Sequence, residues 1–201
     1  MPNDAQRERI LEAALEKFRK FGIRRVTMDE IARDLRVSKK TLYQYFPDKE
    51  ALVRACTVKI QDSLIPMIAE AIDRDGPPIN RILDAWKVLA RIPHFLSAEF
   101  IADIKADYPH IWNEVDVRRH EVISRFEKLI EDGVRTGDIR REIHPRVAMR
   151  IIFAVIDQVM VPDVLALAEF TPAEAINTLV TMFSKGMCAT TPEPPAAEVV
   201  R

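Results

Sequence analysis

Apolar residues recur every three or four positions along nearly the whole chain, and sustained alternation of apolar and polar residues is nearly absent. Ile10, Leu11 and Ala14 begin the first such stripe, and Phe18 continues it toward Gly22. This period places apolar side chains on one face of a helix, and a Gly just past the stripe is typical of a helix end. The chain is therefore expected to be all-α.

Pro, Gly and capping residues divide the remaining stripes into further helices. Beyond residue 47, the predicted helices span about residues 48–73, 79–91, 97–107, 111–136, 145–168 and 172–187. Pro66 lies inside the first of these and is expected to bend it, because proline removes a backbone hydrogen bond. The Pro-rich tail is expected to be disordered.

Two short helices joined by a tight turn are predicted within residues 26–50. Thr27 and Glu30 have the spacing of a capping box at the start of the first helix, and Ser38 is expected to cap the second. The second helix carries donors and aromatic residues on its outer side, and no acidic residue occurs in residues 36–47. This pattern predicts a helix-turn-helix whose second helix is suited to the major groove of DNA.

The run IA-x-x-L-x-VSK-x-TLY-x-YF-x-x-KE-x-L resembles the DNA-binding segment of the TetR family of bacterial transcriptional regulators. The resemblance is close over roughly the first 55 residues and extends to the rest only as a helical layout. Arg36 stands where the family often has Gly, and Lys40 where it often has a small residue. A non-Gly residue with positive φ costs on the order of 1 kcal/mol, so the turn at Arg36 is either strained or shaped differently.

The resemblance implies a homodimeric regulator that binds a double-stranded DNA operator. We predict an N-terminal three-helix DNA-binding domain at residues 1–50, a helical ligand-binding and dimerisation domain at 51–188, and a disordered tail at 189–201. The residues assigned to DNA binding are Thr27, Ser38, Lys39, Lys40, Thr41, Tyr43, Gln44, Tyr45 and Lys49.

The charge distribution agrees with this division. Residues 1–50 carry 12 Lys and Arg against 9 Asp and Glu, whereas the remaining residues carry 18 against 22. A basic excess beside the helix-turn-helix suits DNA binding, although the excess is small enough to arise by chance. Cys56 and Cys188 lie far apart, which favours a reduced, cytoplasmic protein. No signal peptide and no membrane-spanning run is expected.

The last two predicted helices are apolar on more than one face, and a helix that is apolar all round is buried on all sides. We therefore expect them to form the homodimer interface, as the resemblance also implies; a fully intramolecular core is the alternative. The residues assigned to the dimer interface are Ile152, Val155, Val159, Ile176, Leu179, Val180 and Phe183.

Aromatic and aliphatic residues of the predicted body are candidates for a small-molecule pocket, although core packing is the safer interpretation of any single one. The residues assigned to ligand binding are Trp86, Phe100, Phe126, Phe153, Asp157 and Met160. Asp157 lies within an apolar run, where an unpaired carboxylate is costly to bury. It is expected to orient a cationic or donating ligand, to lie at the dimer seam, or to pair with an Arg such as Arg150.

No catalytic arrangement, metal-ligand spacing or cofactor motif is recognisable, so the chain is not expected to be an enzyme. The sequence predicts a repressor that an apolar ligand releases from its operator. An activator or a protein-interaction module with the same fold remains an alternative, as does a helical enzyme built around Asp157 and His120.

Overall fold

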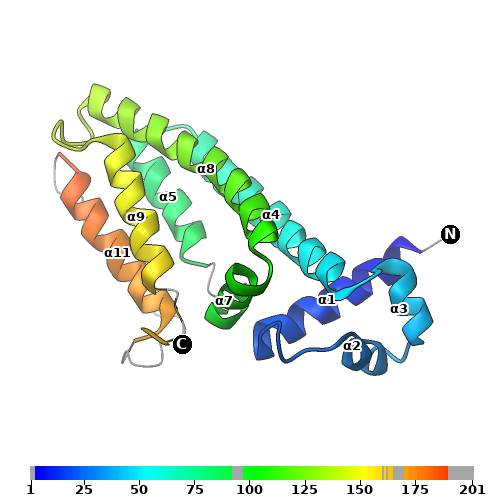
Figure 1. Ribbon diagram of the computed structural model, residues 1–201. Coiled ribbons are helices and arrows are strands. Elements are labelled where there is room, and N and C mark those ends of the chain that lie inside the picture. The colour runs from blue at the N-terminus through cyan, green and yellow to red at the C-terminus, as the bar shows by residue number, and fades with distance from the viewer. Residues whose placement is uncertain (1–2, 92–96, 160, 162, 165–169, 190–201) are drawn as a thin grey trace, which may run out of the picture.

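The computed structural model describes residues 3–91, 97–159, 161, 163–164 and 170–189. Within these ranges all the regular elements are α-helices (Figure 1), which confirms the predicted fold class. None of the described helices is long and apolar enough to cross a membrane. The helices are α1 (Asp4–Phe21), α2 (Met28–Asp34), α3 (Lys39–Tyr45), α4 (Lys49–Asp73), α5 (Pro78–Leu89), α7 (Ala98–Asp107), α8 (Pro109–Thr136), α9 (Pro145–Val159) and α11 (Pro172–Met187).

One predicted helix is wrong at its C-terminal end. The helix expected to run from Pro145 to Ala168 ends at Val159, and Val161 is not helical. The next residue in the sequence is Pro162, and proline disfavours the helical conformation of the residue before it. Ala168 lies outside the described residues, as does the predicted disordered tail beyond residue 189.

Two hydrophobic clusters hold the helices together. The first joins α1, α2 and α3 to the first part of α4, and Phe100, Ile104 and Ile111 contribute to it from α7 and α8. The second lies among α4, α5, α8, α9 and α11. We call α1–α3 the head and α5–α11 the body, and α4 runs from one to the other (Figure 1). The first cluster extends past residue 50, where the sequence places the domain boundary.

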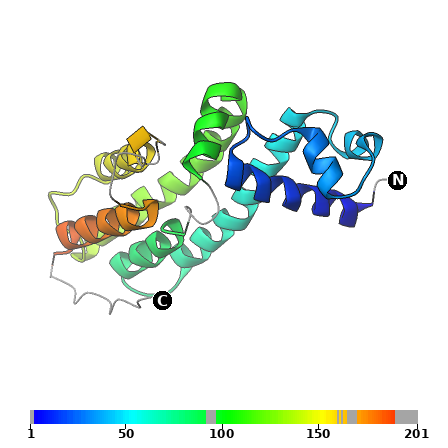
Figure 2. The same ribbon diagram turned by 90° about the horizontal axis from the view of Figure 1, so that it is seen from below.

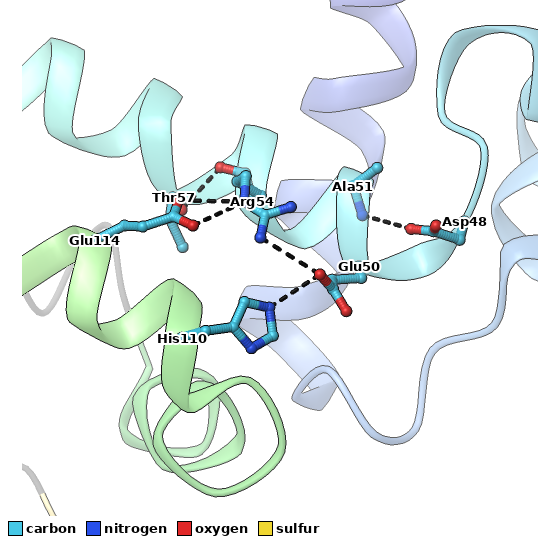
Figure 3. Close-up of polar contacts among 7 residues, drawn as sticks. All are labelled: Asp48, Glu50, Ala51, Arg54, Thr57, His110 and Glu114. Carbon is cyan, nitrogen blue, oxygen red and sulfur yellow. Dashed lines mark hydrogen bonds and ion pairs between the residues drawn. The ribbon is translucent and has the colours of Figure 1, made fainter.

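Polar side chains attach the head end of α4 to the start of α8 (Figure 3). Arg54 Nε donates to both carboxylate oxygens of Glu114 at 3.1 Å. His110 Nε2 lies 2.9 Å from Glu50 Oε1, and Arg54 Nη2 donates to the same oxygen at 3.3 Å. The helix that leaves the head is therefore held against the body from its first turns.

Candidate functional site

Helices α2 and α3 begin at the side-chain caps that the sequence predicts. Thr27 Oγ1 accepts a hydrogen bond from Glu30 N–H (3.2 Å), and the Glu30 carboxylate accepts one from Thr27 N–H (2.8 Å). These hydrogen bonds from Thr27 hold the pKa of Glu30 below its usual value. Ser38 Oγ likewise accepts a hydrogen bond from Thr41 N–H at 3.0 Å. Thr27 and Ser38, both assigned to DNA binding, thus start the two helices, and Thr41 is half-buried behind its cap.

The turn between α2 and α3 is a Schellman motif centred on Arg36. Val37 N–H donates to Ala32 C=O and Arg36 N–H donates to Arg33 C=O, both at 3.0 Å. This pattern places the residue after the helix cap in the left-handed region, where glycine is usual. Arg36 has φ 55°, so the turn keeps the shape that glycine would adopt. Of the two possibilities that the sequence left open, the turn is strained at Arg36.

Replacing Arg36 with Gly should stabilise the protein by about 1 kcal/mol, because the steric strain of a left-handed L-residue is removed. The free energy of unfolding from urea denaturation measures this. Arg33→Gly is the matched control. Arg33 lies inside α2, where a glycine should lower the stability of the protein by about 0.5–1 kcal/mol. Equal destabilisation by the two substitutions would show that Arg36 carries no strain.

The outer face of α3 is free of acidic side chains and open to solvent. Leu42 is fully buried in the first cluster, which turns Lys39, Lys40, Tyr43 and Gln44 outward. Lys39 Nζ pairs with Asp29 Oδ2 at 2.5 Å, and this contact raises the pKa of Lys39. Among the described residues no ion pair engages Lys40, so its ammonium group is available to another molecule.

Two residues assigned to DNA binding lie off this face. Tyr45 is half-buried against the first cluster, and its hydroxyl accepts a hydrogen bond from Asn3 N–H at 3.0 Å. Lys49 begins α4 and is half-buried, and burial lowers its pKa although Asp103 and Asp107 act against this. Both positions depend on packing between helices, which helical spacing alone does not reveal.

The body contains a small cavity of about 10 Å³ between α5, α9 and α11. Trp86 from α5 meets Phe183 from α11 edge to face there, with ring centroids 6.1 Å apart. Among the described residues the indole Nε1 of Trp86 has no hydrogen-bond partner. The cavity is wholly apolar and includes five residues that the sequence assigned to the dimer interface. Its lining consists of Trp86, Leu89, Ile152, Ile156, Ile176, Leu179, Val180 and Phe183.

The other aromatic residues assigned to ligand binding are not part of this cavity. Phe100 is buried in the first cluster, with its ring centroid 6.4 Å from that of Phe18. Phe126 is fully buried in the second cluster, and Phe153 is half-buried at the edge of that cluster. Met160 lies outside the described residues. Of the assigned residues that the structure describes, only Trp86 lies at the cavity wall.

Asp157 lies in a cluster of opposite charges on α7, α8 and α9. Arg119 donates to both of its carboxylate oxygens, at 3.0 and 3.3 Å, and Lys105 Nζ lies 3.6 Å from Oδ1. The Arg119 guanidinium also lies over the ring of Phe153, 5.4 Å from its centroid. The partner is thus Arg119 from another helix and not the neighbouring Arg150. Sequence spacing does not reveal a pair that tertiary packing creates.

Helices α9 and α11 carry exposed apolar side chains on the side away from the cavity. Met182 is 67% exposed, Ile151 49% and Val147 51%. Val155 is half-buried beside them, in an open groove that Met182 also lines. The side chain of Val159 lies outside the described residues. Ile152 and Ile176, by contrast, are buried within this chain, so the two helices have an inner and an outer apolar face.

Comparison with known proteins identifies the head. A family model described as "Bacterial regulatory proteins, tetR family" matches residues 10–56. The transcriptional repressor SCO4008 of Streptomyces coelicolor is 28% identical over 137 residues, which cover 68% of this chain and 68% of that protein. Across several curated relatives, the aligned part spans between 50% and 70% of their own length.

Solved structures share the whole fold. A TetR/AcrR-family transcriptional regulator from Thermobifida fusca superimposes with a TM-score of 0.73 and 22% identity, covering 92% of this chain and 98% of that one. The regulator FadR from Bacillus subtilis, solved in complex with stearoyl-CoA, has a TM-score of 0.68 and 17% identity over 89% of this chain and 98% of that one. At these identities the likeness establishes the fold alone.

Proposed function

We propose that this chain, which belongs to the tetR family of bacterial regulatory proteins, is a homodimeric repressor that an apolar small molecule releases from its operator. The observation that carries the proposal is the outer face of α3, where Lys40, Tyr43 and Gln44 are exposed and acidic residues are absent. Donors on such a helix suit base edges in a major groove. Two heads of a dimer would then bind half-sites about 34 Å apart, or a multiple of that distance.

Lys40 is the best candidate for reading a base, because its ammonium group is exposed and not held by an acid among the described residues. Replacing Lys40 with Ala should reduce discrimination at one base position of each half-site by about 1–3 kcal/mol, if Lys40 pairs with guanine. The duplexes for this test are those that the native protein selects from a random-sequence library. The affinities of the native and Lys40→Ala proteins are then measured for these duplexes and for every single-base variant of them.

Lys128→Ala is the matched control, because Lys128 is also exposed but lies on α8 in the body. It should leave both the affinity and the base preference unchanged. If Lys40→Ala weakens all duplexes by the same factor, Lys40 contacts a phosphate and does not read bases. If the native protein enriches no sequence from the library, the proposed function itself is wrong.

The exposed apolar face of α9 and α11 supports the homodimer. Contiguous exposed apolar surface on a soluble protein marks an interaction site, and Val147, Ile151 and Met182 all lie on these two helices. A twofold axis between two copies would pair the same face with itself. We therefore assign the interface to this outer face, with Val155 at its edge, and not to the buried Ile152 and Ile176.

The apolar cavity supports an apolar effector. The cavity has room for about one water molecule at most, so any larger ligand must separate the helices that line it. One of these is α5, which packs along α4, so entry of the ligand would move α4 and change the distance between the two heads. The FadR neighbour, solved with stearoyl-CoA, is consistent with an effector that has an apolar chain. Arg119 and Lys105 already pair with Asp157. We therefore propose that the effector has no cationic group that binds Asp157.

A further inference from the structure

A buried carboxylate on α7 holds the loop that joins α1 to α2. Asp103 is 9% exposed, and its Oδ2 accepts hydrogen bonds from Ile23 N–H at 2.7 Å and Arg24 N–H at 3.0 Å. Figure 2 shows α7 beside the end of α1, at the junction of head and body. A carboxylate that accepts backbone N–H groups in a buried place makes stronger hydrogen bonds than neutral acceptors do.

The loop is shaped to receive this carboxylate. Gly22 ends α1 with φ +76°, a conformation that side chains disfavour, and a Cβ built on it would lie 3.0 Å from Asp103 Oδ2. Glycine therefore allows the backbone to approach the carboxylate closely enough for the next two N–H groups to reach it. The loop thus supplies the close approach and the two N–H donors, and Asp103 supplies the acceptor.

A second contact lies on the solvent side of the first. Arg24 donates from Nε and Nη2 to the two carboxylate oxygens of Asp107, each at 2.7 Å. This hydrogen-bonded pairing lowers the pKa of Asp107. Because the Arg24 side chain is 59% exposed, the pair alone contributes little to stability. The buried Asp103 is therefore the principal attachment, and Asp107 adds orientation.

The same helix also contacts the far part of the body. Lys105 lies between Asp103 and Asp107 in the sequence, yet its Nζ lies 3.6 Å from Asp157 Oδ1 on α9 and 4.5 Å from the ring centroid of Trp112 on α8. One short stretch of α7 thus connects the head loop to α8 and α9. Helix α9 contributes residues to the cavity and also carries part of the exposed apolar face.

We propose that Asp103 is a positioning residue that fixes the orientation of the head and thereby the half-site spacing the protein accepts. Without Asp103, the head would be oriented by α4, by the apolar contacts of the first cluster and by the exposed Arg24–Asp107 pair. A rigidly held head restricts a dimer to one separation of its two recognition helices, whereas a loosened head adapts to several. The proposal rests on the proposed function, because it requires two heads on one operator.

The test uses the full-length protein and duplexes selected by the native chain, with the spacer between half-sites at its selected length and with one or two base pairs added or removed. For Asp103→Ala, the affinity ratio between the selected and altered spacings should fall about tenfold or more, as expected when hydrogen bonds to a charged acceptor are lost. Amide hydrogen exchange at Ile23 and Arg24 should accelerate in the same variant. Base preference within a half-site should stay unchanged.

Asp62→Ala is the control, since Asp62 also joins two helices, through Arg118 at 2.6 Å, but does not contact the head loop. It should preserve the spacing ratio. Where Asp103→Ala does not fold, the nearly isosteric Asp103→Asn and the loop variant Gly22→Ala replace it, with the same expected loss of spacing preference.

Faster exchange with an unchanged spacing ratio would mean that Asp103 only stabilises the loop, and the proposal would be overturned. Failure of all three variants to fold would also reduce Asp103 to a structural role. A native protein that selects no DNA, or that binds every spacing alike, would overturn the two-headed repressor and this proposal with it. If the native protein strongly prefers one spacing and the folded variants keep that preference, this proposal is overturned but the proposed function is not.

Discussion

Replacing Met182 with Glu should convert the protein from a dimer to a monomer and weaken operator binding about 10²–10⁴-fold, because two linked heads gain that much over one. Met182 is 67% exposed in the single chain, so the new charge does not disturb the fold of the monomer. In an apolar interface the same charge would be desolvated without a partner, which is costly. Sedimentation measures the assembly, and titration with selected duplexes measures the affinity.

Val117→Glu is the control for this experiment. Val117 is 66% exposed but lies on α8, away from the pair of helices assigned to the interface. The variant should remain dimeric and bind the operator with native affinity. A native protein that sediments as a folded monomer at micromolar concentration would contradict the dimer, and a dimeric Met182→Glu would place the interface elsewhere.

Replacing Phe126 with Ala should lower the free energy of unfolding by about 3–5 kcal/mol, the range typical of a large buried side chain that leaves a cavity. Phe126 is 0% exposed and lies in the second cluster, where its ring is surrounded by the body's own side chains. Core packing, one of the two roles that the sequence left open for this residue, predicts this loss. Urea denaturation of the native and variant proteins measures it.

Phe21→Ala is the matched control, because Phe21 is 45% exposed on α1 and its shortening should cost little stability. If Phe126→Ala is as stable as the native protein but no longer responds to an apolar effector, Phe126 lines a ligand site. Equal losses from the two substitutions would mean that Phe126 is less well packed than its burial indicates.

The local signals of the head were sufficient to predict its helices. Thr27 with Glu30, and Ser38 with the backbone of Thr41, form the expected caps because capping is decided within four residues of sequence. The sequence left open whether the turn at Arg36 is strained or shaped differently, and the φ of 55° in the structure decided for strain. The residues that carry the DNA-binding proposal, Lys40 and its neighbours on α3, follow from the same short-range pattern.

Asp103 illustrates a signal that was present but not used. It lies three residues after Phe100 and one before Ile104, so helical spacing places it near the buried face of α7. A carboxylate at such a position needs a partner. The identity of that partner, the backbone of Ile23 and Arg24, lies about 80 residues away in the sequence, and no local rule connects the two.

The sequence by itself determined the caps, the all-α class, the helix-turn-helix and the helices apart from the C-terminal end of α9, because these depend on apolar period and on contacts within a few residues. Only the tertiary structure decided which apolar face of α9 and α11 is internal, and that Arg119 is the partner of Asp157. Ile151 and Ile152 are both apolar, and the sequence does not tell their environments apart, but Ile151 is 49% exposed and Ile152 3%. That difference depends on where α8 and α11 pack against α9, and packing between helices is a property of the whole chain.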